Sequence, residues 1–469
     1  MECNSHIPSS RELASSVDVE ATAVQISISA YNQRKSSESS ILGATVIIGL
    51  CQHHSTMTSR AFPPLQISAV QLNLDVLDHI CEFLTDTPDV LSFSVTCSSL
   101  RPSAIRRLLS MRVIKIWNPR VLHSLHAFIA ADATTRAPRI RGLDIDDLRP
   151  SSKSNASKLA KEVARELLDL LAWANNLRYL NIRAPKYIRH LDLLRDRRLL
   201  PALSRWTALQ ELTCQIGSDH TDGDFLRFIQ SPLKILRLHG YINWTPELIY
   251  KYASHLAPTL EYLELGSAIG LWHRFDGSTS SPLRIQFPAM RSFVVLSDAG
   301  IFARLDILME LFPNLDETLH FSGDKGLLMR NQLREENTRA QEYRSWTRLR
   351  HLICSSEGFY SLALLCLITK VTVWDVRPDT AHCITQRLHH NPVPRLALTV
   401  FYWKGFDALR DLLPGTCALT TTHLSLFLRY DPNAMLLYRA AADGVNFTEY
   451  STEQLVVSAR NCEQLVIRI

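Results

Sequence analysis

One apolar pattern recurs along this chain from residue 111 to the C-terminus, and it constrains the fold more than any other feature. Within six residues it places apolar side chains at the first, fourth and sixth positions, as in Leu177-Leu180-Ile182. The pattern or a variant of it begins thirteen times, at intervals of roughly 29 residues on average. This spacing predicts repeated units of one short strand and one helix, in which neighbouring units cover one another's apolar faces. The copies begin at Met111, Ile140, Leu177, Leu209, Leu233, Leu260, Met290, Leu315, Leu349, Ile368, Val393, Thr421 and Cys462.

The segments between these strands carry helical signals. Apolar residues repeat at helical spacing in residues 157–174, and Thr245 before Pro246 is a typical capped helix start. We therefore expect an α/β solenoid over residues 111–469, with parallel strands on its concave wall and helices on its convex wall. An ordinary α/β domain is the alternative, but its glycine-rich first turn is absent from the sequence. The other helices are predicted at 222–230, 246–256, 299–311 and 452–460.

The strand pattern also predicts which side chains face a ligand. Successive side chains of a strand point to opposite faces, so the residues between the apolar positions face the concave wall. Aromatic and arginine side chains are the usual contributors to protein interfaces, and Arg183 with Arg237 on one wall would suit a phosphate. The alternative is a solvated sheet face without a ligand. The substrate-binding candidates are Tyr179, Arg183, Arg237, His239, Tyr262 and Trp374.

Three short helices are predicted immediately before the repeats, within residues 67–110. Asn73 is a suitable N-cap for the first, Thr87 with Pro88 opens the second, and the third spans 102–109. About forty residues cannot hide all of the apolar side chains that these helices carry. We therefore expect the helices to bind a partner, to cap the end of the solenoid, or both.

The first 66 residues differ from the rest of the chain. Residues 1–60 contain thirteen serines and no sustained helical or strand period, which predicts a disordered arm. Met57 is a second candidate for the start of the working protein. The apolar run 41–50 has only ten residues, about half of what a membrane-spanning helix needs, so no membrane insertion is expected.

The composition is that of a globular protein without a recognisable catalytic motif. Apolar residues make up 46% and charged residues 21% of the chain, and the net charge of +5 is too small to indicate nucleic-acid binding. The ten cysteines occur singly, as expected of buried free thiols in a reducing compartment. Residues 219–224, DHTDGD, resemble a cation-binding loop but lack EF-hand spacing. We expect no cofactor, no metal and no enzymatic activity, although an enzyme assembled from distant residues is a third reading.

The first of the three predicted helices carries Asp75, Val76, Leu77, Ile80, Phe83 and Leu84, and the second carries Val95 and Cys97 near its end. With these residues, the segment 72–109 resembles an F-box. The sequence departs from the family pattern at Asn73, where the family has a proline, and it lacks the tryptophan that usually follows the cysteine. An F-box followed by leucine-rich repeats is similar to the F-box/LRR proteins of mushroom-forming fungi.

The resemblance implies a substrate receptor of a Skp–cullin–F-box ubiquitin ligase, in the cytoplasm or nucleus. The F-box would bind a Skp-type adaptor, and through it a cullin, while the repeats bind an unidentified protein substrate. The alternative is a leucine-rich-repeat scaffold that binds partners without the adaptor and uses the degenerate F-box as an end cap. The implied adaptor-binding residues are Leu72, Val76, Leu77, Ile80, Phe83, Leu84, Val90, Leu91 and Val95.

Overall fold

A computed structural model describes twelve stretches of the chain. These are residues 73–96, 98–146, 148, 156–183, 199–216, 220–240, 244–266, 286–296, 304–321, 330–401, 421–429 and 464–468. The chain divides into two compact units, Met1–Gln71 and Leu72–Ile469, and all described residues belong to the second. The predicted arm, Met57 and Leu72 therefore lie outside the described residues.

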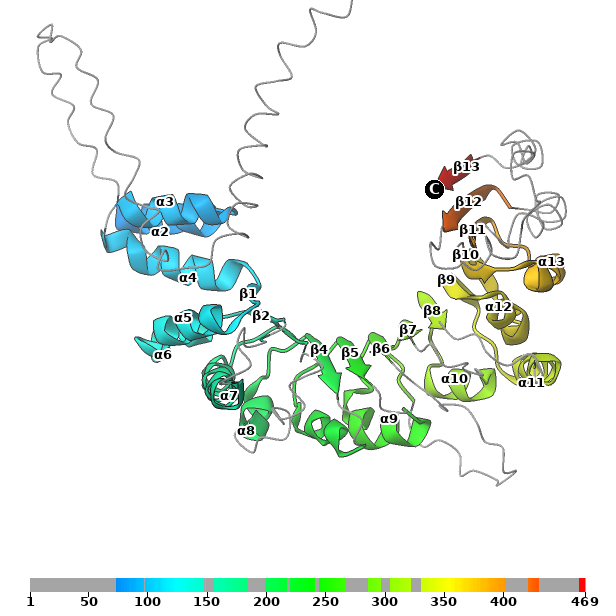
Figure 1. Cartoon of the computed structure of the whole chain (residues 1–469), viewed down its shortest axis with the longest axis horizontal. Coiled ribbons are helices and arrows are strands. Elements are labelled where there is room, and N and C mark those ends of the chain that lie inside the picture. The colour runs from blue at the N-terminus through cyan, green and yellow to red at the C-terminus, as the bar shows by residue number, and fades with distance from the viewer. Residues whose placement is uncertain are drawn as a thin grey trace, which may run out of the picture. The chain divides into compact units, whose positions relative to one another are not determined.

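The described strands form one parallel sheet in which each strand pairs with the next along the chain (Figure 1). All thirteen predicted strands are confirmed, because each copy of the apolar pattern lies at a strand. The strands are β1 (Ile114–Ile116), β2 (Gly142–Ile145), β3 (Tyr179–Ile182), β4 (Glu211–Ile216), β5 (Ile235–Gly240), β6 (Tyr262–Leu265), β7 (Ser292–Val295), β8 (Thr318–Phe321), β9 (Arg348–Ser355), β10 (Leu367–Val376), β11 (Arg395–Phe401), β12 (His423–Arg429) and β13 (Gln464–Arg468).

The fourth position of the apolar pattern sets the register of the sheet. Leu143 pairs with Leu180, Leu180 with Leu212, and Leu212 with Leu236, and the same row continues to Leu465 on β13. Because these residues lie on one face of neighbouring strands, each repeat covers the apolar side chains of the next. The sheet-wide row explains why a short pattern in the sequence was sufficient to predict every strand.

The helices that follow α4 cover one face of the sheet, and within the Leu72–Ile469 unit the strands line the inner side and these helices the outer side (Figure 1). The predicted solenoid-like α/β arrangement is thus present in the described part of the chain. The helices are α2 (Leu74–Phe83), α3 (Thr87–Thr96), α4 (Arg101–Met111), α5 (Pro119–Ala130), α6 (Ala133–Arg136), α7 (Ala156–Trp173), α8 (Leu199–Arg205), α9 (Pro246–Ala253), α10 (Leu305–Leu311), α11 (Arg330–Tyr343), α12 (Ser356–Leu362) and α13 (Pro378–His390).

Most helices predicted between the strands are present, with one correction. Helix α7 matches the prediction for 157–174, and the Thr245 hydroxyl caps α9 by accepting a hydrogen bond from the Leu248 N–H at 3.3 Å. The segment expected to form a helix at 222–230 is instead a 3₁₀ helix, His220–Phe228. Helix α10 occupies the end of the predicted 299–311 segment, whose first residues lie outside the described ones, as does the whole of 452–460.

Buried amide side chains satisfy the backbone of the turns between repeats. Asn391 donates to the carbonyl oxygens of Leu364 and Cys366, both at 2.8 Å. Asn337 accepts a hydrogen bond from the Leu305 N–H at 2.8 Å and donates to the Ser361 carbonyl at 2.9 Å. These contacts matter because a turn enclosed between repeats has polar backbone groups that water does not reach.

Helices α2, α3 and α4 form a small unit at the N-terminal end of the sheet. The Asn73 side chain caps α2 by accepting a hydrogen bond from the Asp75 N–H at 3.0 Å, as predicted. Helix α4 holds the end of α2, because the Arg107 guanidinium donates twice to the Leu84 carbonyl at 2.9 and 2.8 Å. The core of this unit is small and consists of the buried residues Cys81, Val90 and Ala104.

Two properties of the described residues bear on the sequence predictions. Among the described residues, Cys81, Cys214, Cys354 and Cys366 are buried and form no disulfide, in agreement with the expectation of free thiols, and Cys383 is also buried. In the described part of the chain, no helix combines the length and the apolar character that crossing a membrane requires.

Candidate functional site

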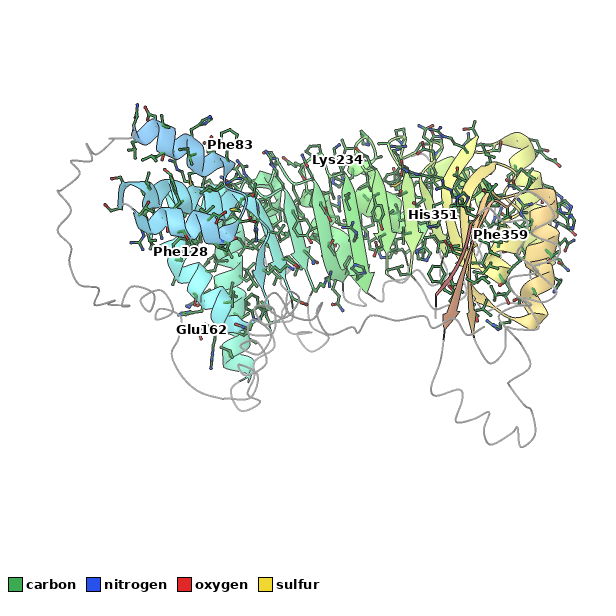
Figure 2. All side chains as sticks on the ribbon, turned by 90° about the horizontal axis from the view of Figure 1, so that it is seen from above. Phe83, Phe128, Glu162, Lys234, His351 and Phe359 are labelled. Carbon is green, nitrogen blue, oxygen red and sulfur yellow. The ribbon has the colours of Figure 1, made fainter. Side chains whose placement is uncertain are left out.

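The first candidate surface is a group of exposed apolar side chains on α2 and α3, called here the apolar helix surface. Val76, Ile80 and Phe83 follow one another at helical spacing on α2, and Phe83 is 70% exposed at the end of that helix (Figure 2). On α3, Leu91 and Val95 are one turn apart. Large apolar groups concentrated on one small unit mark an interaction site more often than scattered ones. The members are Leu74, Val76, Ile80, Phe83, Leu91 and Val95.

The structure places most of the predicted adaptor-binding residues on this surface, but not all of them. Leu77 and Leu84 are half-buried, and Leu84 packs against the small core. Val90 is fully buried in that core, so it supports the surface from inside and is not available for direct contact. Leu74 was not predicted, although its position in the first turn of α2 was a signal for it. It is 47% exposed.

Two roles were predicted for the small unit, binding a partner and capping the end of the solenoid. The contacts of α4 account for the second. Its Ala104 belongs to the small core, whereas Leu109 and the half-buried Ile105 belong to the large core of the repeats. Helix α4 therefore covers the first repeat, as a terminal cap must. This capping leaves the exposed apolar residues of α2 and α3 unexplained.

The second candidate surface is the face of the sheet opposite the helices, called here the open face. Three of the predicted substrate-binding residues lie together on β5 and β6. The Arg237 guanidinium forms ion pairs with Glu211 and, at 3.5 Å, with Glu264, and it lies 5.0 Å from the centre of the Tyr262 ring. His239 Nε2 is 3.7 Å from a Glu264 carboxylate oxygen. Arg237 is thus already neutralised, which argues against the predicted phosphate contact at this residue.

The pKa values of two tyrosines on this face, Tyr262 and Tyr179, are raised. Burial, together with the hydrogen bond that its hydroxyl donates to Glu264 at 2.6 Å, raises the pKa of Tyr262 to about 12. Burial and the nearby carboxylates of Asp144 and Glu211 raise the pKa of Tyr179. Both tyrosines are therefore neutral at physiological pH and act as hydrogen-bonding aromatic surfaces, not as acids.

Asn181 and Thr213 lie in the same row of the open face as Arg237, and this part of the row is more enclosed than the sequence indicated. Asn181 is 1% exposed and donates to the Asp144 carboxylate at 2.7 Å, and Thr213 is 4% exposed. Adjacent strands in register account for this burial, because each side chain is flanked by its neighbours. Arg183, one of the predicted candidates, remains exposed at the end of β3.

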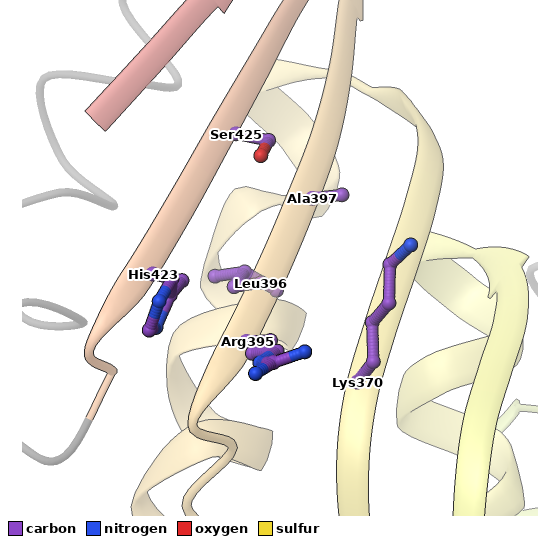
Figure 3. A pocket seen from close by; sticks show the side chains of 6 residues that line it. All are labelled: Lys370, Arg395, Leu396, Ala397, His423 and Ser425. Atoms are coloured by element: carbon purple, nitrogen blue, oxygen red, sulfur yellow. The ribbon is translucent and has the colours of Figure 1, made fainter. Parts of the chain in front are cut away.

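The C-terminal half of the open face carries a different set of charges. In the register of β10, β11 and β12, Lys370 pairs with Arg395, and Arg395 with His423. These residues line a hollow of about 310 Å³ together with Leu396, Ala397 and Ser425 (Figure 3). Arg395, Ala397 and Ser425 were not predicted, because they lie in repeats that begin at Val393 and Thr421 and carry weaker copies of the apolar pattern.

Trp374, the last predicted candidate, follows Lys370 and Thr372 along the same face of β10 and is half-buried. Its indole Nε1 is buried and has no hydrogen-bond partner among the described residues. His351 on the neighbouring β9 accepts or donates a hydrogen bond with the Thr372 hydroxyl at 2.9 Å. The structure therefore divides the six predicted substrate-binding residues between two ends of the open face.

The described residues contain no group of three or more histidine, cysteine, aspartate or glutamate side chains arranged to hold a metal. The DHTDGD segment lies partly outside them. No protein-family model matches this chain, and no curated protein matches it in sequence.

Proposed function

We propose that this chain is the substrate-recognition subunit of a Skp–cullin–F-box ubiquitin ligase. In this proposal α2, α3 and α4 form an F-box that binds a Skp-type adaptor, and the repeats bind a target protein as leucine-rich repeats do. The chain itself carries out no covalent chemistry, since the ligase transfers ubiquitin through its other subunits and the receptor supplies proximity. Such a role places the protein in the cytoplasm or nucleus.

The observation that carries the proposal is the apolar helix surface. Six large apolar side chains of α2 and α3 are at least 42% exposed, whereas Ile105 and Leu109 of α4 pack against the core of the repeats. Burying such groups in a partner contributes about 25 cal/mol for each Å² of apolar surface removed from water, before the entropy lost on association is subtracted. The order of the two regions, three short helices before a repeated sheet, agrees with the family that the sequence resembles.

A second function, an adaptor-independent scaffold, is favoured by the contacts of α4. Ile105 and Leu109 pack against the core of the repeats, which is what an end cap requires. The departures at Asn73 and after Cys97 point in the same direction, because they weaken the likeness to an F-box. In this alternative the open face binds a partner and no ubiquitin is transferred.

Co-purification of the full chain with a co-expressed Skp-type adaptor separates the two functions. We expect a one-to-one complex that is lost when Val76→Asp and Ile80→Asp are combined, because a charge on each exposed side chain opposes burial. These positions are preferred to the half-buried Leu77, whose substitution would also disturb the helices. Circular dichroism of each variant confirms that the fold is intact.

The matched control combines Leu365→Asp and Leu367→Asp. These apolar residues are 55% and 63% exposed at the opposite end of the sheet, so the variant has the same charge change without touching α2. It should bind the adaptor as the unchanged protein does. A folded chain that ignores the adaptor would support the scaffold, and a complex that survives the Val76 and Ile80 changes would show that another surface binds it.

A further inference from the structure

Two cationic side chains lie next to each other at the C-terminal end of the open face. Lys370 on β10 and Arg395 on β11 are direct partners in the register of the sheet, which places their backbones about 4.8 Å apart. Both are exposed, and within the described residues neither forms an ion pair. His423 on β12 continues the row on the other side of Arg395.

The next row of the same strands supplies space and hydroxyl groups. Ala397 stands between Thr372 and Ser425 in the register of the sheet. The alanine has only a methyl group where its neighbours have longer side chains, and the hollow of about 310 Å³ lies over this point (Figure 3). A ligand group in the hollow would therefore meet two cations, an imidazole and a hydroxyl.

The histidine beside the hollow does not carry charge at neutral pH. Burial, together with the positive charges of Lys370 and His320, lowers the pKa of His351 to about 4. Its ring is hydrogen-bonded to the Thr372 hydroxyl. His351 therefore adds no positive charge beside Lys370 and Arg395.

The other end of the open face is poorly suited to an anion. An anion approaching Arg237 would have to displace the carboxylates of Glu211 and Glu264. Those carboxylates, with Asp144, also repel a long and uniformly charged polyanion such as a nucleic acid. A peptide avoids this repulsion because it can place its negative charge at one point and neutral residues elsewhere.

We propose that the hollow over Ala397 binds an anionic group, a phosphate or a carboxylate, carried by an extended segment of a target protein. Lys370 and Arg395 supply the charge, while His423 and Ser425 supply hydrogen bonds. The proposal deepens the proposed function, on which it rests for the statement that the bound protein is a ligase target. The site itself depends only on the contacts of β10, β11 and β12.

Fluorescence anisotropy with the full chain and three labelled peptides tests the proposal. The peptides share one sequence and carry two phosphoserines, two aspartates or two unmodified serines at the same positions. We expect the charged peptides to bind and the serine peptide not to bind, and the comparison of the first two identifies phosphate or carboxylate as the preferred group. Combining Lys370→Glu with Arg395→Glu should weaken binding of the charged peptides at least roughly tenfold.

A matched control combines Arg348→Glu with Arg350→Glu. These arginines on neighbouring β9 have side chains that are 70% and 74% exposed and already lie near Asp316 and Glu317. The control has the same change in net charge, so it should leave peptide binding within about twofold of the unchanged protein. Ala397→Val fills the hollow without altering charge and should weaken binding several-fold.

Three results of the peptide experiments would overturn the proposal. The first is that neither charged peptide binds, the second is that the control weakens binding as much as the changes at Lys370 and Arg395, and the third is that Ala397→Val has no effect. Tighter binding of a uridine oligonucleotide than of the phosphopeptide would also overturn it, in favour of an RNA surface. The variants at Lys370 and Arg395 should still co-purify with the adaptor, so a failure at the hollow is distinguishable from a failure of the proposed function.

Discussion

The small helical unit and the repeated sheet bury their apolar residues to very different extents. In the helical unit Cys81, Val90 and Ala104 are the fully buried members of the core, and large apolar side chains of α2 and α3 remain exposed. In the sheet one continuous core extends from Leu109 to Leu426. Stacked repeats can cover one another, whereas three short helices have too little volume to cover themselves. Large apolar residues of α2 and α3 are therefore available to a partner, whereas the apolar row that crosses the sheet is buried.

The largest expected effect is on the free energy of unfolding. It is tested by comparing two aliphatic residues that look equivalent in the sequence, one from each region. Leu236 is fully buried in the row that crosses the sheet, whereas Ile80 is 42% exposed on α2. We expect Leu236→Ala to lower the free energy of unfolding by about 2–5 kcal/mol because it leaves a cavity. Ile80→Ala should lower it by less than about 1 kcal/mol. Urea denaturation of the full chain measures both.

Two outcomes would contradict this difference between the two regions. A large loss of stability in Ile80→Ala would mean that the apolar helix surface is part of the folded core and not a binding surface. A negligible loss in Leu236→Ala would mean that the row of apolar residues does not hold the repeats together. Leu365→Ala is a suitable control, since Leu365 is exposed at 55% and lies in the repeats.

The sequence was sufficient to predict the sheet because one rule sets every strand. A residue such as Leu263 must face the core in each copy, and a slip of one position would expose it. The 3₁₀ helix His220–Phe228 was missed because the apolar spacing of such a short segment does not distinguish 3₁₀ from α geometry. Val90 was assigned to the surface for a similar reason, since only the packing of α4 shows which face of α3 is enclosed.

The open face could be predicted as a set of residues but not as a site. Arg237 seemed available in the sequence, yet Glu211 and Glu264 from the neighbouring strands bind it. These residues lie 26 and 27 positions away, so the ion pairs follow from the register of the sheet and not from the local sequence. Ala397 was overlooked because a small residue signals a hollow only when its neighbours across the strands are known.

A second test compares two side chains that each donate twice to backbone carbonyls. Asn391 binds the carbonyls of Leu364 and Cys366 and is 8% exposed. Arg107 binds the Leu84 carbonyl in the helical unit but is only half-buried. Asn391→Ala should lower the free energy of unfolding by about 1–3 kcal/mol because water cannot replace the lost bonds, and Arg107→Ala by about 0.5–1.5 kcal/mol.

Urea denaturation measures this second pair, and hydrogen exchange locates the effect. Exchange should increase around the turn after α12 in the first variant and at the end of α2 in the second. Equal losses in the two variants would show that the helical unit excludes water as well as the repeats do. That result would remove much of the difference between the two regions.

The smallest expected effect concerns pH and one histidine on the helices of the repeats. His123 on α5 is hydrogen-bonded at 2.7 Å to Glu166 on α7, and this bond raises its pKa above the ordinary value of 6.5. A raised pKa stabilises the folded state fully below the unfolded value, and the contribution is lost as pH rises through the folded value. The stability that His123→Gln removes should therefore be larger at about pH 5.5 than at about pH 8.5. Thermal denaturation of the unchanged protein and of the variant at the two pH values measures this difference, and an equal loss of stability at both values would contradict the expectation.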